Sequence, residues 1–552
     1  MNKDKRDCAE PKKQSFFRKW APVFILSLGL AIIIIDTTLL NVSLGNLIRD
    51  LNTDIQSIQW VITAYSLTLA ALTITGGRLG DLFGRKKMFV LGAIIFAIGS
   101  FIASISTSVN MMIIGESIIE GVGAALMMPA TASLLVSTYK GRDRAIAMGM
   151  WGGVAGAASA IGPILGGFLT SNYSWRWGFR INVFVAIILV LGSLIIKECR
   201  DKEEKRSLDF LGVILSSFGM LFFVFGIIES SKYGWWRAKE IFTAFGHSLN
   251  FGDISIVPYS ILLGLIFIIL FVFWELKVAK SKNTPLVSMT LFKNQQFTSS
   301  LVTTSVMAIG QAGIIFSFPI FFQAVRGFDA YQTGLAFLPM SITSFLVAPL
   351  SVIFSKKVSP KRMIQVGLFI SILSSIVLRN ALVVDAVAKD FIPGMILYGL
   401  GMGLMMAQIS NMSLSAVSVE EAGEASGVNN TFRQIGSTLG SAIIGAALLT
   451  ALSTNMANGV KESKIIPEQA KVQISEAVSS QASNIDFGGG AKLSTNTPPV
   501  IANEITKISH QATTDANRMA LLYAILFTSI GFIVSFKLPG SKDIELNKSA
   551  AK

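Results

Sequence analysis

The sequence predicts an all-helical integral membrane protein with about fourteen transmembrane helices. Of its 552 residues, 52% are hydrophobic and only 14% are charged, whereas about a quarter of the residues of a soluble domain are charged. Apolar stretches of the ~20 residues needed to span a ~30 Å hydrocarbon core recur along nearly the whole chain. This pattern excludes a soluble enzyme and a protein with a single membrane anchor.

The predicted spans follow one another with connections that are mostly short. In chain order they are 21–46, 56–76, 88–107, 110–136, 145–170, 177–196, 209–229, 256–276, 297–323, 332–354, 363–380, 390–416, 431–452 and 519–537. An even number of spans places both ends of the chain on one side of the membrane. The first span is too long for a secretory signal and contains Asp36, so we expect it to be retained.

The basic residues indicate which side of the membrane is the cytoplasm. The formal net charge is +14, which taken alone could indicate a nucleic-acid partner. The Lys and Arg residues, however, cluster in short loops between alternate spans, as in 85–87, 140–144 and 356–362. The positive-inside rule explains this distribution better. We therefore expect no nucleic-acid partner and a multi-pass protein of the cytoplasmic membrane with both termini in the cytoplasm.

Few residues suit metal, redox or nucleotide chemistry. Both cysteines, Cys8 and Cys199, fall on the predicted cytoplasmic side, so neither a disulfide framework nor a thiolate metal site is expected. The sequence contains no Gly-x-x-x-x-Gly-Lys-Ser/Thr loop, which argues against nucleotide-driven transport. We expect no cofactor, no metal and no enzyme activity.

Two connections on the predicted outer side are longer than turns. The first, 230–255, contains Trp235 and Trp236, which we expect to anchor at the level of the lipid headgroups. The second, 453–518, is rich in Ser, Asn, Ala and Gln. It predicts a polar helical hairpin outside the membrane.

An internal repeat divides the spans into two groups. The segment 121–128, GVGAALMM, recurs as GLGMGLMM at 399–406, and both copies are expected to cross the membrane in the same direction. Duplication explains this better than chance and predicts two six-helix halves with two helices inserted between them. Parallel repeats place a binding site near the midplane between the halves. The predicted parts are a cytoplasmic N-terminal segment 1–20, a first half 21–196, the inserted helices with their loops 197–296, a second half 297–537 that includes the outer loop 453–518, and a cytoplasmic tail 538–552.

Three acidic side chains fall inside predicted spans. A carboxylate at bilayer depth costs at least ~2.5 kcal/mol, so such residues usually line a cavity or carry an ion. Asp36 lies roughly 21 Å along its span from the cytoplasmic end, while Glu116 and Glu120 lie roughly 9 and 15 Å below the outer end of theirs. These depths overlap, and a spacing of four puts both glutamates on one helix face. We predict that all three are proton-coupling or substrate-binding residues, which would exchange a proton for a cationic substrate.

A structural role is the alternative for these acids. Asp36 would then bond to neighbouring hydroxyl groups such as those of Thr37 or Thr38, and the glutamates would form a hydrogen-bond network.

A glycine-rich basic turn, GRLGDLFGRKK at 77–87, follows the second span. Asp81, near a helix end, can pair with the helix dipole and with a neighbouring arginine. We predict a conformational latch that holds the halves in one state, and the alternative is a topology signal alone. The predicted latch residues are Gly77, Asp81, Gly84, Arg85 and Lys86.

Four motifs in order resemble the major facilitator superfamily, and in particular its fourteen-span drug:proton antiporters. The 77–87 turn is similar to the superfamily's signature loop and departs from it at Leu82, where a basic residue is common. Segments 175–182 and 423–436 look like the fourteen-span group. The resemblance implies an antiporter motif of Gly153, Gly162, Pro163, Gly166 and Gly167. It also marks a second-half motif of Asn430, Arg433 and Gln434.

One departure concerns the fourth span. The superfamily's antiporters commonly carry an Arg there, three residues before a Gln-Gly pair, and this sequence has Ser117, with Glu120 and Gly121 in place of the pair. The basic residue that the resemblance links to proton handling is therefore missing. Glu116, next to the vacant place, could take a related role with the opposite charge.

The residues and the resemblance together predict a multidrug:proton antiporter that exports amphipathic, cationic toxic compounds by alternating access and confers antibiotic resistance. One alternative is an exporter of a specific endogenous metabolite or antibiotic, and a second is a non-transporting membrane sensor or assembly partner. The expected partners are a small-molecule substrate, protons and the lipid bilayer. A periplasmic adaptor protein remains open, and a monomer is expected.

Overall fold

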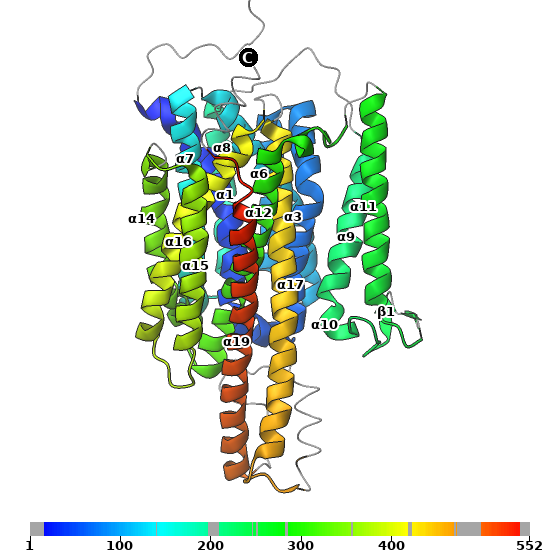
Figure 1. Cartoon of the computed structure of the whole chain (residues 1–552), viewed down its shortest axis with the longest axis vertical. Coiled ribbons are helices and arrows are strands. Elements are labelled where there is room, and N and C mark those ends of the chain that lie inside the picture. The colour runs from blue at the N-terminus through cyan, green and yellow to red at the C-terminus, as the bar shows by residue number, and fades with distance from the viewer. Residues whose placement is uncertain are drawn as a thin grey trace, which may run out of the picture.

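A computed structural model describes residues 16–139, 141–196, 209–244, 247–249, 252–281, 285–354, 357–417, 422–468, 471 and 498–540. The helices run side by side in one elongated bundle (Figure 1). In chain order the elements are α1 (Phe16–Val42), α2 (Leu44–Asp50), α3 (Ile55–Phe83), α4 (Arg85–Ser104), α5 (Val109–Met112), η1 (Ile113–Glu120), α6 (Gly121–Thr138), α7 (Gly141–Asn172), α8 (Arg176–Gly192), η2 (Ser193–Ile195), α9 (Phe210–Ile228), α10 (Ser230–Tyr233), β1 (Phe242–Ala244), β2 (His247–Leu249), α11 (Ile256–Lys280), η3 (Leu291–Lys293), α12 (Gln295–Ile320), η4 (Phe321–Val325), α13 (Ala330–Ala336), α14 (Leu338–Phe354), α15 (Pro360–Ala381), α16 (Ala388–Ser415), α17 (Ala422–Glu462) and α19 (Pro499–Ser535).

The long helices confirm the predicted fold class. Among the described residues, twelve helices are long and apolar enough to cross a membrane, and α13 with α14, bent by 43°, makes a thirteenth. The glycine-rich α7 is 32 residues long and occupies the remaining predicted span. Every predicted span therefore corresponds to a long helix or to a helix with a short irregular turn.

Several short elements depart from a purely α-helical chain, and those in the outer segment and in the fourth span bear on the sequence predictions. Within the outer segment 230–255, β1 pairs antiparallel with β2, with Thr243 opposite Ser248. In the predicted fourth span, residues 113–120 form the π-helix η1 rather than a continuous α-helix. Glu116 and Glu120 are therefore presented by a π-helix rather than by the continuous α-helix that the sequence predicts for this segment.

The polar outer hairpin is built from the last two long helices. At 41 and 37 residues, α17 and α19 exceed the length of a span, and both extend beyond the bundle at one end (Figure 1). Val460, Ile466 and Ile505 form a small apolar cluster between these extensions. The tip at 472–497 lies outside the described residues.

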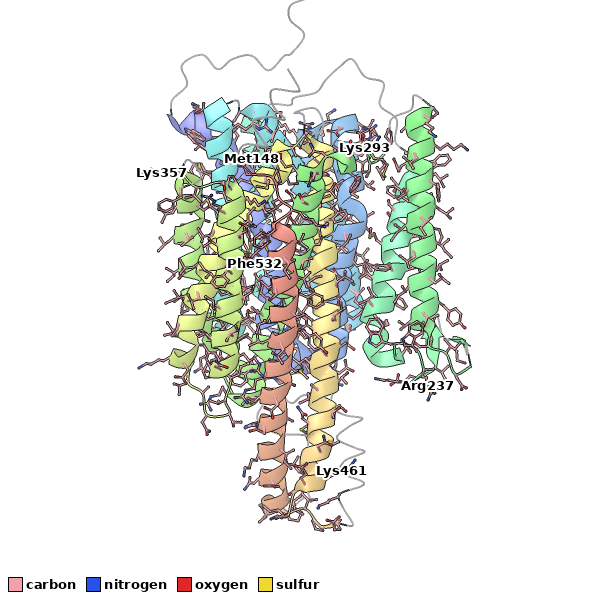
Figure 2. All side chains as sticks on the ribbon, in the orientation of Figure 1. Met148, Arg237, Lys293, Lys357, Lys461 and Phe532 are labelled. Carbon is pink, nitrogen blue, oxygen red and sulfur yellow. The ribbon has the colours of Figure 1, made fainter. Side chains whose placement is uncertain are left out.

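Basic side chains mark the two ends of the bundle. Figure 2 shows Lys293 and Lys357 at one end, Arg237 toward the other, and Lys461 near the tip of α17. We call the end that holds the α3–α4 turn the inner end, because its basic loops predict that it faces the cytoplasm, and we call the opposite end the outer end.

Helix contacts define where the two predicted halves meet. In the first half, α1 packs against α7, and α3 packs against α6. In the second half, α12 packs against α17 and α19. The halves touch where α3 meets α17 and where α7 meets α13 and α14. The pair α9 and α11 lies beside the bundle (Figure 1) and reaches it through contacts of α9 with α3 and α17. The exact domain bounds stay a prediction.

Candidate functional site

The three intramembrane acids meet inside the first half. Asp36 on α1 and Glu120 on η1 share one hydrogen-bond donor, the side-chain amide of Asn182 on α8. Asn182 Nδ2 lies 2.8 Å from Asp36 Oδ1 and 3.1 Å from Glu120 Oε1. The same nitrogen lies 3.3 Å from the hydroxyl oxygen of Ser100 on α4. We call Asp36, Glu116, Glu120 and Asn182 the carboxylate cluster.

Glu116 joins the cluster from the same π-helix. The Ser117 hydroxyl lies 2.8 Å from both Glu116 Oε2 and the carbonyl oxygen of Val61 on α3. Asp36 lies within electrostatic reach of both glutamates. The exposed fraction of Asp36 is 1%, and those of Glu116 and Glu120 are 0%. All three carboxyl groups are therefore shielded from bulk solvent.

The cluster has too few partners to hold three ionised carboxylates. Asp36 Oδ2, Glu116 Oε1 and Glu120 Oε2 have no hydrogen-bond partner, and none of the three acids forms an ion pair within the described part of the chain. Ionised carboxylates that are buried without a counter-charge are costly and repel one another. Bound protons are the simplest charges that could neutralise this cluster.

The π-helix has a visible packing partner. An added Cβ at Gly115 would lie 2.7 Å from the backbone nitrogen of Ala103 and 3.1 Å from the carbonyl oxygen of Gly99, so η1 lies directly against α4. Short π-helical segments within α-helices are frequent at functional sites. Here the segment ends at Glu120 and carries both glutamates.

The hydroxyl bonds expected for Asp36 in the structural alternative do not form. Thr37 Oγ1 donates to the carbonyl oxygen of Ile34 at 2.8 Å, and Thr38 Oγ1 donates to that of Ile34 at 3.0 Å. Both threonines therefore satisfy their own helix. The hydrogen-bond donor to Asp36 is instead Asn182, which the sequence analysis included only within the motif 175–182.

A cavity of ≈ 120 Å³ lies between the two halves. It is smaller than the roughly 300–1,000 Å³ of sites for drug-sized ligands. Its described lining residues come from α1, α3, α6, α7, α12, α16 and α17 and include Ile34, Thr37, Asn41, Met128, Gln311, Phe316, Met402, Met406, Arg433 and Gln434. We call this the central cavity.

The carboxylate cluster and the central cavity lie on different faces of α1. Ile33, Ile34, Thr37 and Asn41 line the cavity at helical spacing, while Asp36 points to Asn182 on α8. None of the described lining residues is acidic. A single helix therefore separates the candidate proton site from the candidate substrate site.

Arg433 lies at the junction of two cavities. A second cavity of ≈ 30 Å³ shares Ala155, Met406 and Arg433 with the central cavity and also touches Asn430. Gln434 lines the central cavity next to Arg433. The structure thus brings the three residues of the second-half motif to the space between the halves. In the sequence, these three residues were indicated only by the resemblance of segment 423–436 to the fourteen-span group.

The basic turn at the inner end forms an ion pair. Arg85 Nη2 lies 3.1 Å from Asp81 Oδ1, and the exposed fractions of the two side chains are 13% and 5%. Arg85 Nη1 donates to the carbonyl oxygen of Ser133 on α6 at 3.3 Å. Gly84, with φ of 109°, allows the chain to turn between α3 and α4.

Gly77 is buried and Lys86 is half-buried near this turn. The ion pair connects α3, α4 and α6, which all belong to the first half. A latch between the halves remains a prediction.

The glycines of α7 allow it to lie between α1 and α13. An added Cβ at Gly162 would lie 3.1 Å from the carbonyl oxygen of Ile35, and one at Gly166 would lie 2.8 Å from Leu39 Cγ. At Gly167 the Cβ would lie 2.8 Å from the carbonyl carbon of Ala330 on α13.

The neighbouring positions of this motif differ in how closely they are packed. At Pro163 the backbones are in close contact, because a Cβ added at Gly334 on α13 would lie 2.9 Å from the Pro163 carbonyl carbon. Gly153 is different, because the nearest atom to its added Cβ, Pro349 Cγ, is 3.8 Å away.

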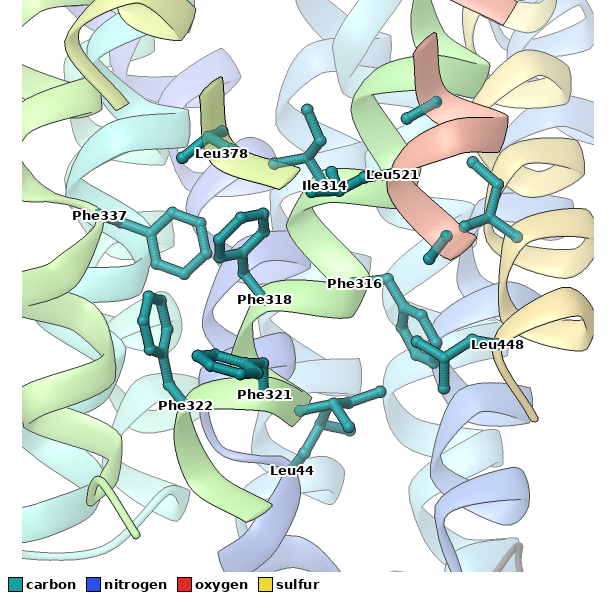
Figure 3. Packing of buried hydrophobic residues seen from close by; sticks show 14 of the residues in the cluster. Leu44, Ile314, Phe316, Phe318, Phe321, Phe322, Phe337, Leu378, Leu448 and Leu521 are labelled. Carbon is teal, nitrogen blue, oxygen red and sulfur yellow. The ribbon is translucent and has the colours of Figure 1, made fainter. Parts of the chain in front are cut away.

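The halves also touch at the outer end. Gln323 Nε2 on η4 donates to the carbonyl oxygen of Val42 at 3.0 Å, and the backbone nitrogen of Tyr331 donates to the Ser171 hydroxyl at 3.0 Å. The rings of Phe318, Phe321, Phe322 and Phe337 gather nearby in the hydrophobic core of the second half (Figure 3). These contacts join the halves on the outer side of the central cavity.

This fold and this site define a membrane transporter with two halves around a central cavity. Residues 26–441 match the Major Facilitator Superfamily, and the chain belongs to this family. It is 28% identical over 433 residues to the tetracenomycin C resistance and export protein of Streptomyces glaucescens, covering 78% of this chain and 76% of that protein. It is 27% identical over 493 residues to the multidrug efflux pump LfrA of Mycolicibacterium smegmatis, covering 88% and 90%.

A solved structure supports the same fold. The crystal structure of a bacterial homologue of the human lysosomal transporter Spinster, inward-facing and unoccupied, aligns with a TM-score of 0.60 at 15% identity. The alignment covers 95% of this chain and 98% of that one. The protein is therefore a multi-pass major facilitator transporter related to drug and antibiotic efflux pumps, and not an enzyme.

Proposed function

We propose that the protein exports amphipathic toxic compounds in exchange for protons by alternating access. The observation that carries this proposal is the carboxylate cluster: three buried acids that form no ion pair with any described residue, one helix away from a cavity between the halves. Drug resistance and efflux in the relatives support export as the direction of transport. Both termini in the cytoplasm remain part of the proposal.

The carboxylate cluster supplies a proton cycle. With protons bound, the buried acids are neutral and tolerate exclusion of water. With protons released, their negative charge favours access of water or movement of α1 relative to α8, because unpaired buried charge is costly. Since α1 also lines the central cavity, a change at Asp36 reaches the substrate on the opposite face of the same helix. This gives coupling without direct contact between proton and substrate.

The other predicted residues have supporting roles in this proposal. The Asp81–Arg85 pair stabilises the inner turn as part of a latch. The α7 glycines let the halves approach at the outer end. The second-half motif contributes to the substrate site.

Export of one endogenous compound is the second candidate. It is favoured by the small size of the central cavity, and the carboxylate cluster would serve it equally well. An exporter of many compounds and an exporter of one compound would differ in the shape of the substrate cavity and would share the same proton cycle.

The decisive test compares Asp36→Asn with wild type in loaded cells, using ethidium and fluorescein as probes with and without a proton uncoupler. We expect uncoupler-sensitive efflux of at least one dye from wild type and none from the variant, because an amide cannot bind and release the proton. Asp385→Asn is the matched control, since the Asp385 side chain is exposed.

Undiminished efflux by a well-inserted Asp36→Asn protein would contradict the proposal. Efflux of neither dye from well-expressed wild type would favour the narrow exporter.

A further inference from the structure

A single charged side chain faces the two cavities among their described lining residues, and it is Arg433. Its Nη2 atom makes only long contacts, 3.4 Å to Asn430 Oδ1 and 3.6 Å to Met128 Sδ. Its Nε atom is buried and has no hydrogen-bond partner. The guanidinium group therefore has donor capacity that the protein does not use.

The charge of Arg433 is not balanced by an acid. No ion pair in the described part of the chain includes it, and neither cavity has a described acidic lining residue. Asp36 and Glu120 bond to Asn182 of α8 on the other side of α1, and Glu116 bonds to Ser117. A guanidinium remains charged in proteins, and a buried charge without a partner is costly. An anionic oxygen group in the cavity would reduce that cost.

The other lining residues of the central cavity indicate which chemical groups the rest of the ligand carries. Ile33, Ile34, Ile62, Ile315 and Phe316 present apolar surface, and Met128, Met402 and Met406 add adaptable thioethers. Asn41, Gln311 and Gln434 offer amide groups. This is the lining of a site for an amphiphile whose apolar body ends in a single acidic group.

We propose that the central cavity binds amphiphiles with a carboxylate or phenolate group and that Arg433 is the anchor for that group. The planar fork of a guanidinium matches a carboxylate through two parallel hydrogen bonds. This inference rests on the proposed export function and replaces the cationic substrate class expected from the sequence. That expectation placed the acids in the substrate site, whereas the structure places an arginine there.

The test measures binding alone, so that its outcome does not depend on proton coupling. Isothermal titration calorimetry of the full-length protein in detergent compares naphthoate with naphthamide, which have the same aromatic body and differ in charge. Wild type should bind naphthoate at least ~10-fold more tightly, as a hydrogen bond to a charged group implies. Arg433→Gln should reduce the ratio of the two affinities to about one.

Two further variants make the result decisive. Arg433→Met, an apolar replacement of similar length, should lose the preference in the same way. Arg180→Gln is the matched control, because Arg180 is exposed on α8, and it should keep the preference. The ratio of affinities within one sample does not depend on the amount of folded protein.

Three results would overturn the inference: equal binding of the two probes by wild type, no measurable binding of naphthoate, or an unchanged preference in the folded Arg433 variants. Tighter binding of ethidium than of naphthoate would restore the cationic class. A failed proposed function would instead appear as uncoupler-insensitive efflux with the naphthoate preference intact.

Discussion

Asn182 determines how the buried acids are arranged. Its amide nitrogen lies between Asp36 and Glu120, which come from α1 and η1. An amide can donate to two carboxylates without adding charge, so the cluster is held together without a permanent counter-ion. An arginine or lysine in this place would neutralise one acid permanently. In the proposed proton cycle, this neutral donor leaves protons free to act as the exchangeable charge.

Replacing Asn182 by Leu should lower uncoupler-sensitive efflux at least ~10-fold. Leu is similar in size to Asn, but it leaves two buried carboxylates without their shared hydrogen-bond donor. The measurement is the initial efflux rate, normalised to the amount of monodisperse protein in the membrane. Asn172→Leu is the matched control, since Asn172 is exposed and its side-chain amide donates to the carbonyl oxygen of Phe168 within its own helix α7. A full rate in the Asn182 variant would show that the shared bond is dispensable.

The sequence identified the acids and missed their partner for a physical reason. A carboxylate in an apolar span is conspicuous because of its transfer cost, whereas one Asn near the start of a span is common. Helix rise gave the depths of Asp36, Glu116 and Glu120, and these depths do allow the acids to meet. The direction in which each side chain points depends on how helices pack. This is why the sequence could not place the acids outside the central cavity.

At the scale of elements, α7 connects the two halves at the outer end. Its glycines bring the backbone of α7 against α1 on one side and against α13 on the other. The sequence predicted both the helix and the motif. It could not tell which glycines are in close contact, because that depends on partners far away in the chain. The π-helix η1 was equally hidden, since apolar periodicity over eight residues does not distinguish it from an α-helix.

Gly167→Val and Gly153→Ala should differ sharply. At Gly167 any Cβ overlaps the backbone of Ala330, so α7 and α13 cannot approach and the outer end cannot close. We expect loss of most transport with normal membrane insertion. At Gly153 there is room for a methyl group, and transport should remain within about twofold of wild type.

Both variants can be compared by dye efflux and by cysteine cross-linking between positions 171 and 331, whose main-chain and side-chain atoms are in contact in this structure. Gly167→Val with normal efflux and normal cross-linking would contradict the role of this contact.

At the scale of the whole molecule, the proposed proton exchange predicts that the charge of the substrate determines which part of the proton-motive force drives transport. Exchange of one inward proton for one outward monocation moves no net charge. Exchange of one inward proton for one outward monoanion moves two positive charges inward. At ~2.3 kcal/mol per charge per 100 mV, a negative interior then contributes about 4.6 kcal/mol per 100 mV.

Export of an acidic dye such as fluorescein should therefore slow when the membrane potential is removed and the pH gradient is kept. Valinomycin with high external potassium achieves this in loaded cells. The same treatment should leave a one-for-one exchange of ethidium unchanged. Fluorescein efflux that depends on the pH gradient alone would contradict the anionic class, even if export itself is proton-driven.

The position of α1 between the carboxylate cluster and the central cavity also bears on how such a protein changes under selection. In the proposed mechanism, the residues that contact the exported compound are distinct from the residues that hold the protons. Substitutions at cavity positions such as Ile62, Gln311 or Phe316 would then alter which compound is recognised and leave the proposed proton-binding residues intact. Under this proposal, a lineage that carries this architecture would acquire resistance to a new compound in single steps while its proton exchange stays intact.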